Sequence, residues 1–79
     1  MAIQQVIELP LGSRIVDAAF QDQMPCIWVL FDDLMEETKQ PVTISIYGTG
    51  HAIWDETPCY IKTVHIDEFV WHFFCSPML

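Results

Sequence analysis

The chain has 79 residues, of which 52% are hydrophobic and 18% charged, a composition that excludes a disordered polypeptide and leaves room for one domain. Eleven Asp and Glu oppose three Lys and Arg, so the formal net charge is -8. Nucleic acids and anionic membranes are bound through clustered cations, and we therefore expect neither as a partner. A basic protein surface is the partner that this charge would attract.

The first strand candidate covers residues 3–9 and ends at Pro10, because proline cannot donate a hydrogen bond to a strand ladder. The Leu-Gly-Ser sequence at residues 11–13 is typical of a turn.

Residues 14–20 and 24–31 predict a hairpin with residues 22 and 23 at its tip. Asp-Gln lacks the glycine that favours positive φ in a two-residue turn, so a longer loop is an alternative. Pro25 fits only an edge strand or the start of a strand. Both faces would carry apolar side chains in this register: Val16 with Val29, Ala18 with Ile27, Ile15 with Leu30, and Asp17 with Trp28.

The acidic stretch at residues 32–40 predicts a connection that tolerates a single helical turn. Residues 42–47 alternate Val, Ile and Ile with Thr, Ser and Tyr, the pattern of a half-buried strand. A Gly-Thr-Gly-His sequence interrupts the chain after this strand. A short strand at residues 52–54 and a loop at residues 55–58 would follow.

Residues 59–66 and 69–75 predict the last hairpin, with residues 67 and 68 near its turn, and residues 76–79 a terminal tail. Apolar residues on both of its faces indicate a central position or an assembly interface. The expected cross-strand pairs are Ile66 with Phe69, Val64 with Trp71, Ile61 with Phe74, Thr63 with His72, and His65 with Val70.

No segment of ten or more residues carries a helical apolar stripe. The sequence therefore predicts an all-β single domain over residues 1–79, a five- to six-stranded antiparallel meander curled into a partial barrel or sandwich. One small sheet buries one face, so the excess of apolar residues also predicts a homo-oligomer. The aromatic residues expected in the core are Trp28, Phe31, Trp71, Phe73 and Phe74, and those expected at an interface are Tyr60, Trp71 and Phe73.

Four segments resemble a family of short, uncharacterised proteins encoded by bacteria, phages and prophages: PCIWVLFD, IYGTGHAI, YIKTV and FVWHFF. The resemblance extends from about Ile7 to Phe74, and GTGH is its most specific element. Asp67 and Glu68 stand where relatives often carry glycines. The resemblance implies a compact β domain of mobile-element origin and implies no particular activity.

The GTGH segment is the candidate ligand site, because two glycines let the backbone approach an anion and place N–H groups around it. The Thr49 hydroxyl and His51 would add hydrogen bonds, and Tyr47 or Trp54 would stack on a base. No phosphate-loop lysine is present and no helix follows, so a glycine turn without a ligand is the alternative. The candidate ligand-binding residues are Tyr47, Gly48, Thr49, Gly50, His51 and Trp54.

Metal binding and catalysis have weaker support. His65 and His72 would share a face, yet no HxH or HxxxH spacing accompanies them. Cys26, Cys59 and Cys75 are odd in number, widely spaced and set among apolar residues, which fits neither a disulfide framework nor a nucleophile. We therefore expect no metal, no cofactor and no enzymatic activity.

The leading hypothesis is a non-enzymatic, phage- or prophage-type accessory protein, an acidic inhibitor that binds a basic patch on a host defence protein. The alternative is a protein that binds or sequesters a nucleotide signal through GTGH, and a virion subunit is a third class. The N-terminus lacks the basic start and apolar core of a signal peptide, so we expect a cytoplasmic location, in the host if a phage encodes the chain.

Overall fold

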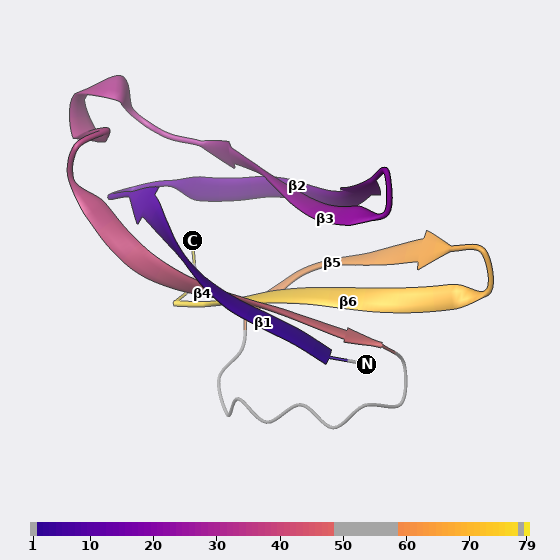
Figure 1. Cartoon of the computed structure of the whole chain (residues 1–79). Coiled ribbons are helices and arrows are strands. Elements are labelled where there is room, and N and C mark those ends of the chain that lie inside the picture. The colour runs from indigo at the N-terminus through magenta and orange to yellow at the C-terminus, as the bar shows by residue number, and fades with distance from the viewer. Residues whose placement is uncertain (1, 49–58, 78) are drawn as a thin grey trace.

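Six strands and one short 3-10 helix make up the part of the chain that the computed structural model describes, residues 2–48, 59–77 and 79 (Figure 1). The predicted all-β class is thus confirmed. The predicted short strand at residues 52–54 lies outside the described residues. The elements are β1 (Ala2–Pro10), β2 (Arg14–Gln21), β3 (Met24–Leu30), η1 (Asp33–Met35), β4 (Lys39–Gly48), β5 (Cys59–Ile66) and β6 (Phe69–Ser76).

The strands form two antiparallel sheets, a four-stranded sheet in the order β1-β4-β6-β5 and the two-stranded hairpin β2-β3. The hairpin lies over one face of the four-stranded sheet, and the two layers do not close into a barrel (Figure 1). The strand order departs from that of a sequential meander, because β1 pairs with β4 and β4 pairs with β6.

The core lies between the two layers and is built from alternate residues of each strand. Phe73, on β6, has no exposed surface, and the Phe20 ring of the hairpin packs edge-on against it with 5.6 Å between centroids. The ring centroids of Phe20 and Trp71 are 6.3 Å apart. The buried apolar residues are Ala18, Val42, Ile44, Ile46, Phe73 and Cys75, with Leu79 among those packed against them.

The β2-β3 hairpin turns through two residues that both have positive φ, Asp22 at 50° and Gln23 at 68°. Two positive values are the signature of a type I′ turn, which matches the twist of the strands. The tip is therefore at the predicted residues, and the alternative of a longer loop is wrong. Pro25 is the second residue of β3, whose described pairing is with β2 alone, and this confirms the predicted edge position.

A bulge at Val16 interrupts the pairing of β2 with β3. The predicted pairs on the tip side of the bulge, Asp17 with Trp28 and Ala18 with Ile27, are confirmed. The two predicted pairs beyond it are wrong, because the extra residue moves each partner by one position. The observed pairs there are Ile15 with Val29 and Arg14 with Leu30.

A second bulge, at Ile61, has the same effect on the β5-β6 hairpin. The four predicted pairs between this bulge and the turn are confirmed, whereas Phe74 faces Tyr60 and not Ile61. Asp67, in the turn, has a φ of 53°. Ser76, predicted as the first residue of the tail, is the last residue of β6. Leu79, also predicted in the tail, is half-buried against the core.

The two bulged strands meet where the layers come together on one side of the molecule. β2 and β5 are in contact there, and the Lys62 ammonium lies 2.6 Å from Asp17 Oδ1. Each of these residues directly follows a bulged residue. Within the described part of the chain, β1 and β3 keep an unpaired edge on the opposite side.

None of the described residues belongs to a helix that is long and apolar enough to cross a membrane.

Candidate protein-binding face

The outer side of the β2-β3 hairpin exposes large apolar side chains. Strand alternation places Met24, Trp28 and Leu30 on the side of β3 opposite the core residue Ile27. Their exposed fractions are 65%, 40% and 62%, and Val16, the bulged residue of β2, is 52% exposed. We call these four residues, Val16, Met24, Trp28 and Leu30, the hairpin face.

The apolar surface continues past the end of β3 into η1. Phe31 is 44% exposed and Leu34 is 91% exposed. The Asp32 carboxylate caps η1 by accepting a hydrogen bond from the Leu34 N–H at 2.9 Å, which fixes the turn that carries Leu34. The expectation that Trp28 and Phe31 lie in the core is therefore wrong, since both side chains remain partly open to solvent.

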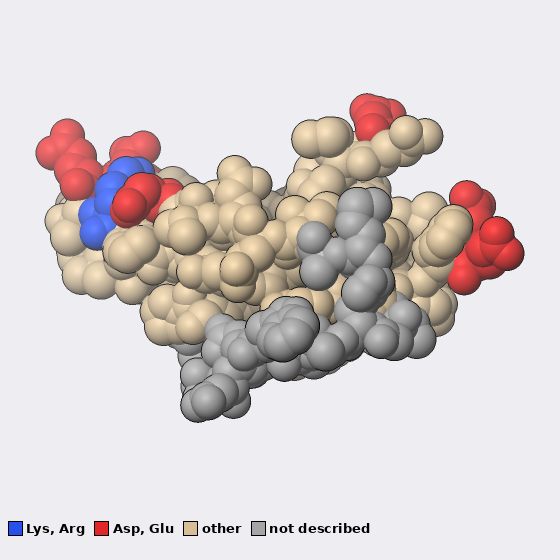
Figure 2. Space-filling view, turned by 60° about the horizontal axis from the view of Figure 1, so that its bottom comes forward, with Lys and Arg blue, Asp and Glu red and all other residues tan. Residues whose placement is uncertain are grey.

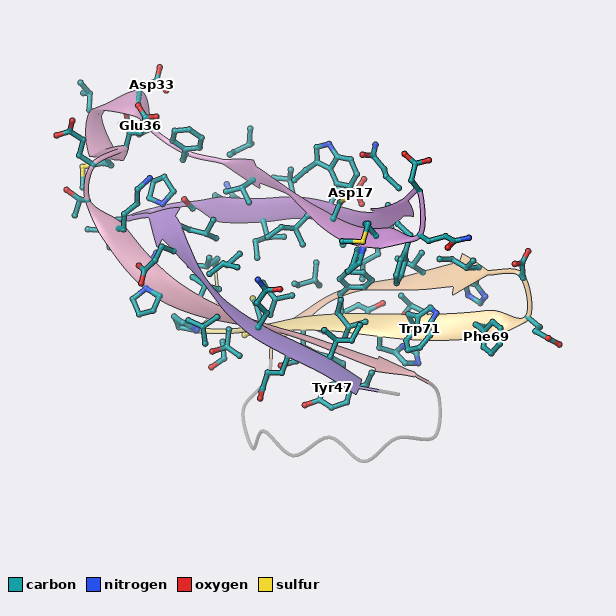
Figure 3. The ribbon with its side chains drawn as sticks, in the orientation of Figure 1. Asp17, Asp33, Glu36, Tyr47, Phe69 and Trp71 are labelled. Atoms are coloured by element: carbon teal, nitrogen blue, oxygen red, sulfur yellow. The ribbon has the colours of Figure 1, made fainter. Side chains whose placement is uncertain are left out.

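Negative charge accompanies this apolar surface. From residue 14 to residue 37 the chain holds one basic residue, Arg14, and six acidic residues. Figure 3 shows Asp33 and Glu36 at the end of the hairpin that carries η1, and Asp17 closer to the β2-β3 turn. The six acidic residues are Asp17, Asp22, Asp32, Asp33, Glu36 and Glu37.

Figure 2 shows Asp and Glu side chains at three places on the outline of the visible face: the left end, where Lys and Arg side chains lie beside them, the right end, and the upper edge. The molecule extends 42 × 29 × 15 Å, so the groups at the two ends are well separated. At physiological ionic strength a charge acts over about 8 Å, so each end acts on the partner surface nearest to it.

Asp17 is the acidic residue with a described cationic partner. Its hydrogen bond from Lys62, and a second from the Ala18 N–H at 2.8 Å, lower the pKa of the Asp17 carboxyl. The Asp17 carboxyl group therefore stays ionised at neutral pH. Lys62 is engaged by this contact, and its charge is largely balanced locally.

An exposed apolar surface flanked by charges of one sign is suited to binding a protein. The centre of such a surface loses water on contact, whereas flanking charges steer the encounter and reject partners of the same sign. Exposed large apolar side chains scattered singly need no explanation, whereas several on one side of a strand mark interaction sites. Met24, Trp28 and Leu30 share one side of β3, and their direct partners on β2 are polar: Gln21, Asp17 and Arg14. The hairpin face therefore presents apolar and polar side chains side by side.

The predicted ligand site is described only at its first two residues. Tyr47 is 4% exposed, and its ring packs edge-on against Phe74 with 5.8 Å between centroids. Gly48 ends β4. Figure 3 shows Tyr47 on the far side of the four-stranded sheet from Asp17. Thr49, Gly50, His51 and Trp54 lie outside the described residues, so ligand binding through GTGH stays a prediction.

The three predicted interface residues do not share one surface. Tyr60 is 61% exposed on the outer side of the four-stranded sheet, next to Phe74. Trp71 is half-buried against Phe20 between the layers, and Phe73 is completely buried. Phe73 thus serves the core of the protomer and offers no surface to a partner.

Tyr60 also begins a short chain of hydrogen-bonding groups. Its hydroxyl lies 2.7 Å from Thr63 Oγ1, which lies 2.9 Å from Nδ1 of His72. In the part of the chain that the structure describes, no group of three or more His, Cys, Asp or Glu side chains is placed to hold a metal ion.

A groove of about 130 Å³ opens between the layers on the side of the unpaired β1 and β3 edges. Among the described residues, isoleucines of β1, β3 and β4 line it, together with Phe73, Pro25 and the polar Gln5. A lining of this kind can accept an aliphatic group and offers little to a charged or strongly polar ligand.

Sequence comparison assigns the chain to a family. Residues 1–78 match DUF7352, a domain of unknown function, and the chain belongs to this family. No curated protein and no solved structure matches the chain.

Proposed function

We propose that this protein acts by binding a partner protein that presents cationic and apolar side chains together. The observation that carries the proposal is the exposed hairpin face, Val16, Met24, Trp28 and Leu30, within a stretch of chain that holds six acidic residues and one basic residue. Binding would remove the apolar side chains from water, and the carboxylates would select a basic surface.

The biological role that fits is inhibition of a host protein by an accessory protein of phage or prophage type. The resemblance of the GTGH and VWHFF segments to phage- and prophage-encoded proteins supports this origin. A small acidic protein can occupy a basic surface that normally holds nucleic acid, since its carboxylates replace phosphates as the partners of Lys and Arg. On this proposal the protein has no catalytic step of its own and acts in the host cytoplasm.

A matched pair of substitutions tests the proposal. Val16, on the hairpin face, and Val6, on β1, are 52% and 61% exposed, so Val16→Ser and Val6→Ser make the same chemical change at similar exposure. Wild-type protein and both variants would be immobilised and exposed to bacterial lysate at low and high salt. We expect wild type and Val6→Ser to retain the same salt-sensitive protein and Val16→Ser to retain much less of it.

Two results would contradict the proposal. One is the absence of any retained protein whose binding weakens with salt. The other is equal retention by Val16→Ser and Val6→Ser. Light scattering on the same samples would test the predicted homo-oligomer, and a thermal-shift screen with nucleotides would test the GTGH alternative, because a ligand that binds the native state raises its Tm.

A further inference from the structure

Two cysteines face each other across the β5-β6 hairpin. Cys59 is the first residue of β5 and Cys75 the seventh of β6, and they are direct partners in the antiparallel register. Direct partners lie on the same side of a sheet; Cys75 belongs to the buried core between the layers, and Cys59 packs against that core. Both thiols are free.

This placement meets the backbone requirement for a disulfide. Directly opposed residues of antiparallel strands have Cα atoms about 4.5–5.5 Å apart. Disulfides span Cα separations of about 4.4–6.8 Å, so the strands need not move apart or together to form one.

The third cysteine has no such neighbour. Cys26, on β3, faces Ala19 and makes a local contact with the Met24 carbonyl oxygen at 3.5 Å. The register therefore distinguishes one cysteine pair from the two other pairings of the three thiols.

The two paired thiols differ in access to solvent. Cys75 is 3% exposed, whereas Cys59 is half-buried at the start of its strand. Burial raises the pKa of the Cys75 thiol, partly offset by a hydrogen bond with the backbone of Leu79. Cys59 is thus the sulfur that a reagent from solvent reaches first.

We propose that Cys59 and Cys75 form a reversible intramolecular disulfide by exchange with a small-molecule disulfide such as oxidised glutathione. The Cys59 thiolate attacks the reagent, forms a mixed disulfide and releases one equivalent of glutathione. The Cys75 thiolate then attacks the Cys59 sulfur and releases the second equivalent. The two protein thiols are oxidised, and the reagent is reduced to two thiols.

Intact-mass spectrometry of the folded protein incubated with oxidised glutathione at mildly alkaline pH tests this inference. We expect Cys26→Ser to lose two hydrogen atoms without accumulating adduct, and peptide mapping to join Cys59 to Cys75. Wild type should form the same disulfide and carry at most one glutathione, on Cys26, which is half-buried and faces no second thiol. Cys75→Ser should stop at the mixed disulfide on Cys59, because the resolving thiol is gone, and dithiothreitol should restore the starting mass of every form.

The inference fails if Cys26→Ser ends as a glutathione adduct or stays fully reduced, or if mapping of wild type joins Cys26 to either partner. It also fails if the mass loss requires denaturant, because the native register would then not be its cause. The Cys26→Ser variant, which retains both paired thiols, keeps the test independent of any misfolding of Cys75→Ser.

Discussion

Gln23→Gly should stabilise the protein, because Gln23 holds a φ of 68° at the tip of the β2-β3 hairpin. A residue with a Cβ pays about 1–2 kcal/mol in this left-handed region, and Asp and Asn are the side chains that tolerate it best. Glycine avoids that cost but loses about 0.5–1 kcal/mol through its greater freedom in the unfolded chain. The difference is a stabilisation of about 0–1.5 kcal/mol, with a central value of about 0.75 kcal/mol.

The measurement is urea unfolding followed by tryptophan fluorescence, with Trp71 in the interlayer core as a reporter. For a domain of this size 1 kcal/mol corresponds to roughly 4–8 °C in Tm, so thermal unfolding gives a second readout. Gln21→Gly, two residues earlier in β2, is the matched control and should destabilise, because glycine weakens a strand. Asp22→Gly should gain less than Gln23→Gly.

The reasoning would be refuted if Gln23→Gly lowered the midpoint, or if Gln21→Gly raised it as much. The first result would show that the tip does not hold a left-handed residue at position 23. The second would show that the gain does not come from relief of the left-handed turn, because Gln21 is a residue of strand β2.

Three further predictions concern the core and the titrating groups. Phe73→Ala should cost about 3–5 kcal/mol in urea unfolding, because a completely buried ring is removed; a loss below about 1 kcal/mol would contradict its central position. The pKa of Asp17 is lowered in the folded state. Its contribution to stability is therefore present above the ordinary carboxyl pKa and disappears as pH falls through the lowered pKa. In a plot of urea midpoint against pH, Lys62→Met should reduce this loss of stability at acid pH. The folded pKa of Cys75 is raised, so stability should fall as pH rises from the ordinary thiol pKa toward the raised one, and Cys75→Ala should remove that fall.

The strand pairing could be predicted from the sequence wherever alternation was unbroken. Ala18 opposite Ile27 and Val64 opposite Trp71 followed from placing each turn at two acidic or polar residues. The predicted strand pairs were wrong beyond Val16 and Ile61. A bulge inserts one extra residue into a strand, and the alternation of apolar and polar residues does not reveal where that insertion occurs. Both bulged residues, Val16 and Ile61, are β-branched and apolar, which is what an ordinary strand position also favours.

The sheet order and the hairpin face could not be predicted from the sequence. Pairing of β1 with β4 joins segments about 35 residues apart, and no local pattern encodes such a contact. Trp28 and Phe31 were expected in the core because large aromatic side chains usually fill it in a small domain. The signal that could have placed them outside was the charge of their surroundings, since the acidic residues of the chain concentrate around this hairpin.

The paired bulges on β2 and β5 bear on how the protein behaves at high concentration. A sheet grows by adding strands to its edges, and irregular, charged edges resist such addition. Within the described part of the chain, one flank carries two bulges and the Asp17–Lys62 ion pair, whereas β1 and β3 carry no bulge. Association of these described strands edge to edge is then favoured through the β1 and β3 flank alone, and contact through one flank alone joins molecules in pairs.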